Sequence, residues 1–131
     1  MAIVNDPITD KAKVFAIRII RLFQHLTEKK KEFILSKQVL RSGTSIGANR
    51  TEAVYACSDK DFLHKNEIAL GECAETLYWL ELLEATSYIS TTEFSSISTD
   101  CEELMKLLAS TVKSLKTKQG NKTAPPHVLS E

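Results

Sequence analysis

Apolar residues recur at heptad-like spacing in four successive segments of this chain, about residues 6–27, 34–57, 58–88 and 90–116. Such spacing places them along one side of an α-helix. Only four Gly and three Pro occur among 131 residues, and long stretches have neither. The connections between the segments are short, which favours antiparallel neighbours. The sequence therefore predicts an all-α protein, an antiparallel up-down four-helix bundle.

Helix start signals support three of these boundaries. Asp6 precedes Pro7, a pairing of N-cap acid and first-turn proline. Ser58 is followed by Asp61, and Ser90 by Glu93, at the spacing of a capping box. Residues 118–131 contain Gly120 and two consecutive prolines without apolar periodicity. We therefore expect one domain over residues 6–117 and a disordered tail over residues 118–131.

The predicted core consists of the apolar residues that repeat along the four segments. They are Phe15, Ile19, Leu22, Ile46, Phe62, Ala69, Leu77, Leu80, Ile97, Leu104 and Leu108. In the second segment the side chains of residues 42–49 are nearly all small. Gly43 and Gly47 each cost a helix about 1 kcal/mol relative to Ala. We expect a neighbouring helix to approach this stretch closely.

Charge is distributed unevenly, although the formal net charge is zero. Residues 1–65 carry twelve Lys or Arg against seven Asp or Glu, and residues 66–131 carry five against ten. The basic half can face nucleic acid or the acidic half of another subunit, or each helix can simply have its own solvated charges. The candidate phosphate contacts are Arg18, Arg21, Lys29, Lys30, Lys31, Lys37, Arg41 and Arg50. We find no aromatic residues interleaved with them for base stacking, so binding is expected to be sequence-tolerant and salt-dependent.

Signals for catalysis, cofactors or metals are missing from the sequence. It has neither a Gly-rich nucleotide loop nor the Glu-x-x-His pairs of a di-iron bundle. We expect no catalytic residues, no cofactor and no metal, and do not expect an enzyme. Four polar residues on the second and third segments are predicted to form a structural network that fixes helix register, with a polar binding site as the alternative. They are Ser45, Asn49, Glu52 and Glu75.

The N-terminus lacks a basic-then-apolar signal pattern. No apolar run approaches the roughly 20 residues that span a bilayer. We therefore expect a cytoplasmic protein without a membrane partner.

The third segment carries more apolar surface than one subunit's core can take up. Tyr78, Trp79 and Leu82 cannot all turn inward on one helix, and residues 67–84 hold five Glu and no Lys or Arg. An acidic, partly apolar face and a basic face on one subunit make a heterologous contact, which closes into a ring when the rotation permits. The sequence predicts a cyclic homo-oligomer with Tyr78, Trp79 or Leu82 at the interface.

A series of motifs in the second and third segments resembles a known family. The motifs are Leu35-x-x-Gln38-x-x-Arg41, Ser45-Ile46-x-x-Asn49-x-x-Glu52, Asp61-Phe62, Ile68-Ala69-Leu70-Gly71, Glu75 and Leu77. They are similar to those of four-helix bundle proteins encoded within intervening sequences of bacterial 23S rRNA genes, to which the accessory variability proteins of diversity-generating retroelements are related. The resemblance covers about residues 9–117. It implies an up-down four-helix bundle, often a homopentameric ring, without enzymatic activity, and nucleic-acid binding for the more basic relatives.

Two function classes follow from these observations. In one, the protein is a non-catalytic oligomeric binding module that acts on RNA or a ribonucleoprotein. In the other, it is a structural protein–protein scaffold with no nucleic-acid binding, and the basic half is used in self-assembly. The zero net charge favours the scaffold.

Overall fold

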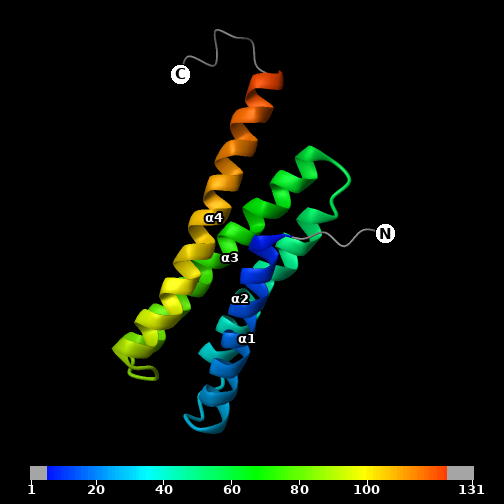
Figure 1. Ribbon diagram of the computed structural model, residues 1–131. Helices are drawn as coiled ribbons and strands as arrows, with labels where there is room; N and C mark the ends of the chain where they lie inside the picture. Colours follow the sequence, from blue (N-terminus) through cyan, green and yellow to red (C-terminus); the bar gives the residue numbers. More distant parts are fainter. Residues whose placement is uncertain (1–5, 124–131) are drawn as a thin grey trace.

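Four antiparallel helices make up the computed structural model, which describes residues 6–123 and side chains up to residue 120. The helices are α1 (Pro7–Glu28), α2 (Leu35–Val54), α3 (Asp59–Ala85) and α4 (Thr91–Thr123). Successive helices run in opposite directions (Figure 1). The predicted all-α, up-down four-helix bundle is confirmed. None of the helices within the described residues is long and apolar enough to cross a membrane.

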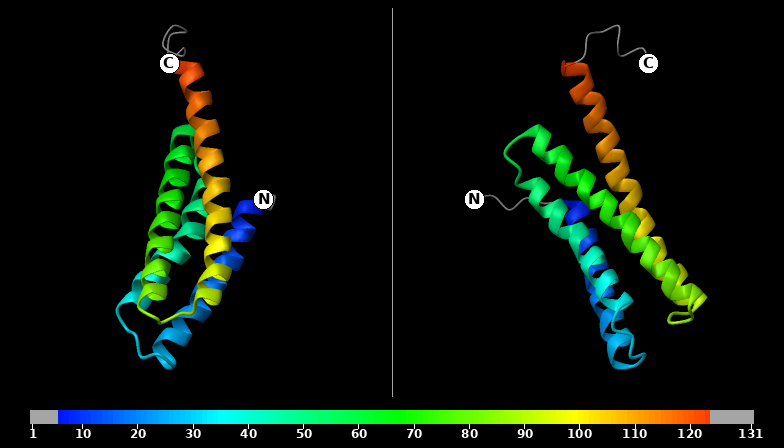
Figure 2. Two further views of the ribbon diagram at one scale, coloured as in Figure 1. Left: turned by 90° about the vertical axis from the view of Figure 1, so that its left-hand side faces the viewer. Right: turned by 180° about the vertical axis from the view of Figure 1, so that it is seen from behind.

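The four helices do not pack equally around one axis. α2 packs against α1 on one side and α3 on the other, α3 packs against α4, and contact between α1 and α4 is the weakest of the four. α4 diverges from the α1–α2 hairpin and continues past the ends of the other helices (Figures 1 and 2). One side of the bundle, between α1 and α4, is therefore loosely closed.

The predicted start signals lie at the observed helix starts. The Asp6 carboxylate accepts a hydrogen bond from the Thr9 N–H at 3.1 Å, and the Ser58 hydroxyl accepts one from the Asp61 N–H at 3.1 Å. At α4 the capping box is complete, because the Ser90 N–H donates to Glu93 at 2.8 Å and the Glu93 N–H donates to the Ser90 hydroxyl at 3.0 Å. Local side-chain chemistry thus sets these three boundaries.

The end of α4 differs from the prediction. Residues 118–131 were expected to be a disordered tail, but α4 continues to Thr123. The Gln119 side-chain amide donates to the Asp59 carbonyl at 3.1 Å, and Lys116 forms an ion pair with Glu67 at 3.2 Å. Near its end, beyond Leu115, the last residue of its apolar pattern, α4 therefore still contacts α3. Residues 124–131, the rest of the predicted tail, lie outside the described part of the chain.

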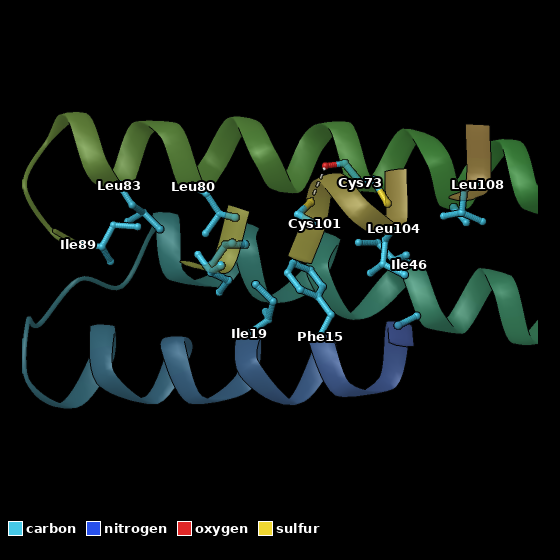
Figure 3. Packing of buried hydrophobic residues seen from close by; sticks show 14 of the residues in the cluster. Phe15, Ile19, Ile46, Cys73, Leu80, Leu83, Ile89, Cys101, Leu104 and Leu108 are labelled. Carbon is cyan, nitrogen blue, oxygen red and sulfur yellow. Dashed lines mark hydrogen bonds between the residues drawn. The ribbon is translucent and has the colours of Figure 1, made fainter. Parts of the chain in front are cut away.

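The core is close to the predicted one (Figure 3). Eight of the eleven expected residues are buried, Leu22 and Leu77 are partly buried and pack against the core, and Phe62 is partly exposed. The Cys101 thiol donates to the Cys73 carbonyl at 3.4 Å, between α4 and α3. The hydrogen bond with Cys101 and burial together raise the pKa of the Cys73 thiol, so it stays protonated and packs as a small apolar side chain.

α1 and α2 approach each other closely at the small residues of α2. A Cβ atom at Gly43 would lie 2.8 Å from two side-chain carbons of Ile19, and one at Gly47 would lie 3.3 Å from the Cβ of Ala12. Ile19 and Ala12 are both fully buried. The glycines are therefore present because α1 occupies the space of a larger side chain.

This close approach predicts opposite effects for two Gly-to-Ala changes. Gly43→Ala should lower the free energy of unfolding by about 1–3 kcal/mol, because buried Ile19 must move to admit the methyl group. Gly71 on α3 is exposed, with no atom within 4 Å of the added Cβ. Gly71→Ala should raise the free energy of unfolding by about 0.5–1 kcal/mol through helix propensity alone. Urea denaturation measures both, and equal gains in the two variants would disprove the close packing.

Candidate interaction surfaces

Arg50 does not belong to the nucleic-acid surface that the sequence predicted. It is only 7% exposed, and its guanidinium donates to both Asp6 carboxylate oxygens at 2.8 and 3.0 Å. A third nitrogen donates to the Asn66 side-chain oxygen at 2.6 Å, and the guanidinium carbon lies 5.5 Å from the centre of the Phe62 ring. Each of its three guanidinium nitrogens donates to a protein side chain, so Arg50 is a structural residue.

The Arg50 ion pair joins three helices at one point. Asp6 caps α1, Arg50 is on α2 and Asn66 is on α3. The hydrogen bond from Arg50, against a smaller opposing effect of burial, lowers the pKa of the Asp6 carboxyl to about 2. The start of α1 is therefore fixed by a carboxylate that both caps a helix and neutralises a buried cation. The sequence showed the cap but not its long-range partner.

The predicted network of Ser45, Asn49, Glu52 and Glu75 does not exist as one unit. The Ser45 hydroxyl and the Asn49 amide donate to backbone carbonyls one turn earlier in α2. Glu52 forms an ion pair with Lys65 at 2.9 Å, while Glu75 pairs with Arg41. Glu52 and Glu75 thus connect α2 and α3 through two separate ion pairs, and further polar pairs between these helices join residues that were not predicted.

One of those pairs is buried between α2 and α3. The Thr76 hydroxyl lies 2.9 Å from the Ser42 hydroxyl, and both residues are fully buried. Like Arg50 with Asn66, this pair joins residues distant in sequence. Small hydroxyl residues can also donate to their own helix, so no local pattern distinguishes such a pair.

Two further predicted cations are neutralised within the subunit. Arg18 donates to Asp100 at 2.7 Å and to the Ser96 carbonyl and hydroxyl, which connects α1 to α4. Arg41 pairs with Glu75 and, at 3.2 Å, with Glu72, which connects α2 to α3. Both remain partly exposed, but their charge is matched by acids of the same copy.

Four predicted lysines lie together at the α1–α2 connection. Lys29, Lys30, Lys31 and Lys37 are exposed, and none has a carboxylate oxygen within 4 Å in residues 6–120. Arg21, also exposed, lies further along α1 and donates to Gln24 at 3.2 Å. We call residues 29–37 the basic end of the bundle. It is the part of the predicted basic surface that retains its charge.

An acidic hollow of about 610 Å³ lies where α3 and α4 adjoin. It contains three glutamates among apolar side chains. Its lining residues are Leu77, Tyr78, Glu81, Leu82, Glu84, Ala85, Phe94 and Glu102. Of the three predicted interface residues, Tyr78 and Leu82 line this hollow, and Tyr78 is 53% exposed. Trp79 packs against the core instead, and its indole N–H donates to Glu75 at 3.2 Å.

α1 carries an exposed aliphatic face that the sequence analysis missed. Val14, Ile17 and Ile20 are 62%, 48% and 40% exposed. Val14 and Ile17 also line the shallow grooves beside α4, where the α1–α4 contact is weak. The sequence signal for this face was a second set of apolar residues on α1, in addition to the set that forms the core. Exposed Lys13 and Arg21 adjoin this set.

The described residues offer no metal site, since no three His, Cys, Asp or Glu side chains among them are grouped to hold an ion. Residues 6–110 match the sequence profile of the 23S rRNA-intervening sequence protein family. The chain belongs to this family. No curated protein matches it.

One solved structure supports the family's fold for this chain. It is the crystal structure of a protein of unknown function from the S23 ribosomal protein family of Bacteroides thetaiotaomicron VPI-5482. The two sequences are 52% identical, the match covers 81% of this chain and 98% of that chain, and the TM-score is 0.80. The bundle of this 23S rRNA-intervening sequence family member is therefore shared with its relative.

The buried ion pair predicts a specific acid sensitivity. Because folding lowers the pKa of Asp6 from 3.8 to about 2, its stabilising effect is complete above the unfolded value and is lost as pH falls towards 2. This group should contribute about 2 kcal/mol to the free energy of unfolding. In Asp6→Asn, stability should fall less steeply between pH 5 and pH 2 than in the wild type, measured by urea denaturation.

Asp10→Asn provides a matched control, because Asp10 is an exposed acid of the same helix. A pH dependence in Asp6→Asn as steep as that of Asp10→Asn would contradict the structural role of Asp6.

Proposed function

We propose that this protein is a non-catalytic scaffold that assembles from several copies. The acidic hollow of α3 and α4 in one copy receives the exposed face of α1 from the next. The observation that carries this proposal is the pair of unlike faces on one subunit. One is acidic with Tyr78 exposed. The other exposes Val14, Ile17 and Ile20, and both cations and acids lie beside it.

Apolar exposure supports the contact. Single exposed apolar residues are common on monomers, whereas a contiguous group flanked by charge marks an interaction site. Val14, Ile17 and Ile20 recur at intervals of three residues on one helix. Burial of such side chains stabilises a contact by about 25 cal/mol per Å² of apolar surface.

Charge supports the pairing of these two faces. Glu81, Glu84 and Glu102 line the hollow. Lys13 and Arg21 flank the α1 face, and Asp10, an acid of the same helix, lies beside Val14. The two faces differ, so their contact is heterologous and closes into a ring when the rotation between copies permits. Five copies are the number that the family resemblance implies.

Light scattering with in-line chromatography should report a mass several times that of the 14.7 kDa chain. Ile17→Asp should lower that mass to one chain, because it places a carboxylate in the apolar contact opposite the glutamates. Since Ile17 is half exposed, the thermal unfolding midpoint of the Ile17→Asp variant should stay near that of the wild type. A wild-type protein that runs as a monomer at micromolar concentration would contradict the proposal.

A charge exchange tests which faces meet. Arg21→Glu and Glu81→Lys should each weaken assembly, and the double variant should regain it, because the opposed charges are restored in reverse. Lys60→Glu, at the start of α3 and outside both faces, serves as the control and should assemble as the wild type does. Failure of the double variant to regain mass would show that these two faces do not meet.

Nucleic-acid binding is the second candidate function, and the basic end supports it. Its four lysines lack carboxylate partners among residues 6–120, whereas Arg18, Arg41 and Arg50 are neutralised within the subunit. Lysine amines bind phosphates as point charges and release counterions when they do so.

The test is the salt dependence of RNA binding by fluorescence anisotropy. Affinity should fall steeply with salt, and Lys29→Glu/Lys30→Glu/Lys31→Glu should weaken binding for all sequences alike and reduce the salt slope. Lys60→Glu is again the control. An unchanged slope in the triple variant, or no binding at low ionic strength, would remove this candidate.

A further inference from the structure

The basic end also carries two exposed apolar side chains. Phe33 is 52% exposed and Ile34 is 74% exposed, and they lie between Lys31 and Lys37 in the chain. The sequence analysis found no aromatic residue among the candidate phosphate contacts. The structure corrects this, because Phe33 is on the surface rather than in the core.

Glu32 holds this segment in one conformation. It is only 8% exposed, and its carboxylate accepts hydrogen bonds from the Ile34 N–H at 3.1 Å and the Ser36 N–H at 2.7 Å. The Ser36 hydroxyl donates to the Glu32 carbonyl at 2.8 Å. Glu32 therefore fixes the backbone at the start of α2, just after Phe33.

This arrangement has an electrostatic consequence. Burial alone would raise the pKa of the Glu32 carboxyl, but backbone N–H groups of Ser36, Leu35 and Ile34 outweigh it and lower the pKa. The carboxylate faces the start of α2, whose dipole it complements.

The backbone before Glu32 is also fixed. Lys31 has a φ of 56°, in the left-handed region. The N–H groups of Lys29 and Lys30 donate to the His25 carbonyl, and that of Glu32 donates to the Leu26 carbonyl. The connection is thus a hydrogen-bonded turn, in which exposed Lys29, Lys30 and Lys31 are close to exposed Phe33 in the chain.

We propose that the basic end binds single-stranded nucleic acid, with Phe33 as a platform on which an unpaired base stacks. This inference deepens the second candidate function, and rests on it. A base face and a phosphate are neighbours in every single strand, and an aromatic ring beside amines matches both. A duplex hides its base faces, so Phe33 has no ligand there.

The acids near the basic end reduce its positive charge but do not cancel it. Glu28 is exposed at the end of α1, and Glu93 of α4 lies near Lys30 and His25. Glu93 is engaged with Ser90 in the capping box. Four lysines against these acids leave a positive surface, and its binding falls with salt.

The experiment uses the full-length protein and fluorescence anisotropy at low salt. The probe is a labelled, unstructured RNA of about twelve nucleotides, a length suited to a site of this size. It is compared with the same strand paired to its complement and with single-stranded DNA of the same sequence. Phe33→Leu should weaken binding of single strands roughly tenfold, while Phe33→Trp retains it. Duplex affinity and the salt slope should not change in either variant.

Ile34→Ala is the matched control. Ile34 is more exposed than Phe33 and equally apolar, but has no ring to stack. Its removal should change RNA affinity less than about twofold, since aliphatic side chains do not replace base stacking. Circular dichroism and light scattering on the same samples check that folding and assembly persist, and so separate this inference from the scaffold proposal.

Three outcomes would overturn the inference. In the first, Phe33→Leu binds single strands as the wild type does, while the lysine variants bind weakly; phosphate binding then stands without stacking. In the second, Phe33 and Ile34 contribute equally to sedimentation with vesicles of anionic phospholipid, and RNA does not bind; the apolar pair then enters a lipid surface. In the third, duplex and single strands lose affinity equally in Phe33→Leu.

Discussion

The close approach of α1 to α2 is the constraint on which the rest of this bundle depends. At Gly43 the Ile19 side chain fills the space of a missing Cβ, and Gly47 meets Ala12 in the same way. α1 is therefore seated deeply on α2. Its contact with α4 is weaker than its contact with α2, and the aliphatic residues Val14, Ile17 and Ile20 stay partly exposed beside it. The surface that we assign to assembly is a direct consequence of this packing.

Buried polar groups hold that arrangement in register. Arg50 connects Asp6, the N-cap of α1, to α2 and α3, and the Ser42–Thr76 hydrogen bond connects α2 to α3. Burying such a pair costs desolvation free energy, and removing one partner strongly destabilises the fold. The pair fixes the position at which α1 starts. The exposed face of α1 is positioned with it.

Much of the fold could be predicted from the sequence, because its signals are local. Heptad-like spacing and the caps at Asp6, Ser58 and Ser90 depend on residues within one turn. Partners distant in sequence could not be predicted. Arg50 looked like a surface cation because nothing near it in the sequence shows Asp6 or Asn66. The exposure of Phe33 could not be predicted either, because it depends on how Glu32 turns inward.

The same limit applies to charge. Counting cations in the first half overstated the basic surface, since Arg18, Arg41 and Arg50 find acids on other helices. The lysines of the basic end remain. If copies assemble by rotation about one axis, every basic end lies on the same side of the ring, and several weak sites then act on one ligand by multivalency. The scaffold and the nucleic-acid site are thus compatible in one assembly.

The central claim, that the α1 face of one copy meets the acidic hollow of another, is tested most directly by cross-linking between copies. Cys57 is the exposed native thiol among the described residues, so Cys57→Ser provides the background. Ile17→Cys and Tyr78→Cys proteins are prepared separately, mixed and oxidised, since a disulfide forms only where the two Cα atoms come within about 7 Å.

The mixture should yield covalent dimers that each protein alone does not, and Ile17→Cys mixed with Lys60→Cys should not yield them. The account would be contradicted if the protein is assembled but the mixture of Ile17→Cys and Tyr78→Cys gives no more covalent dimer than that control.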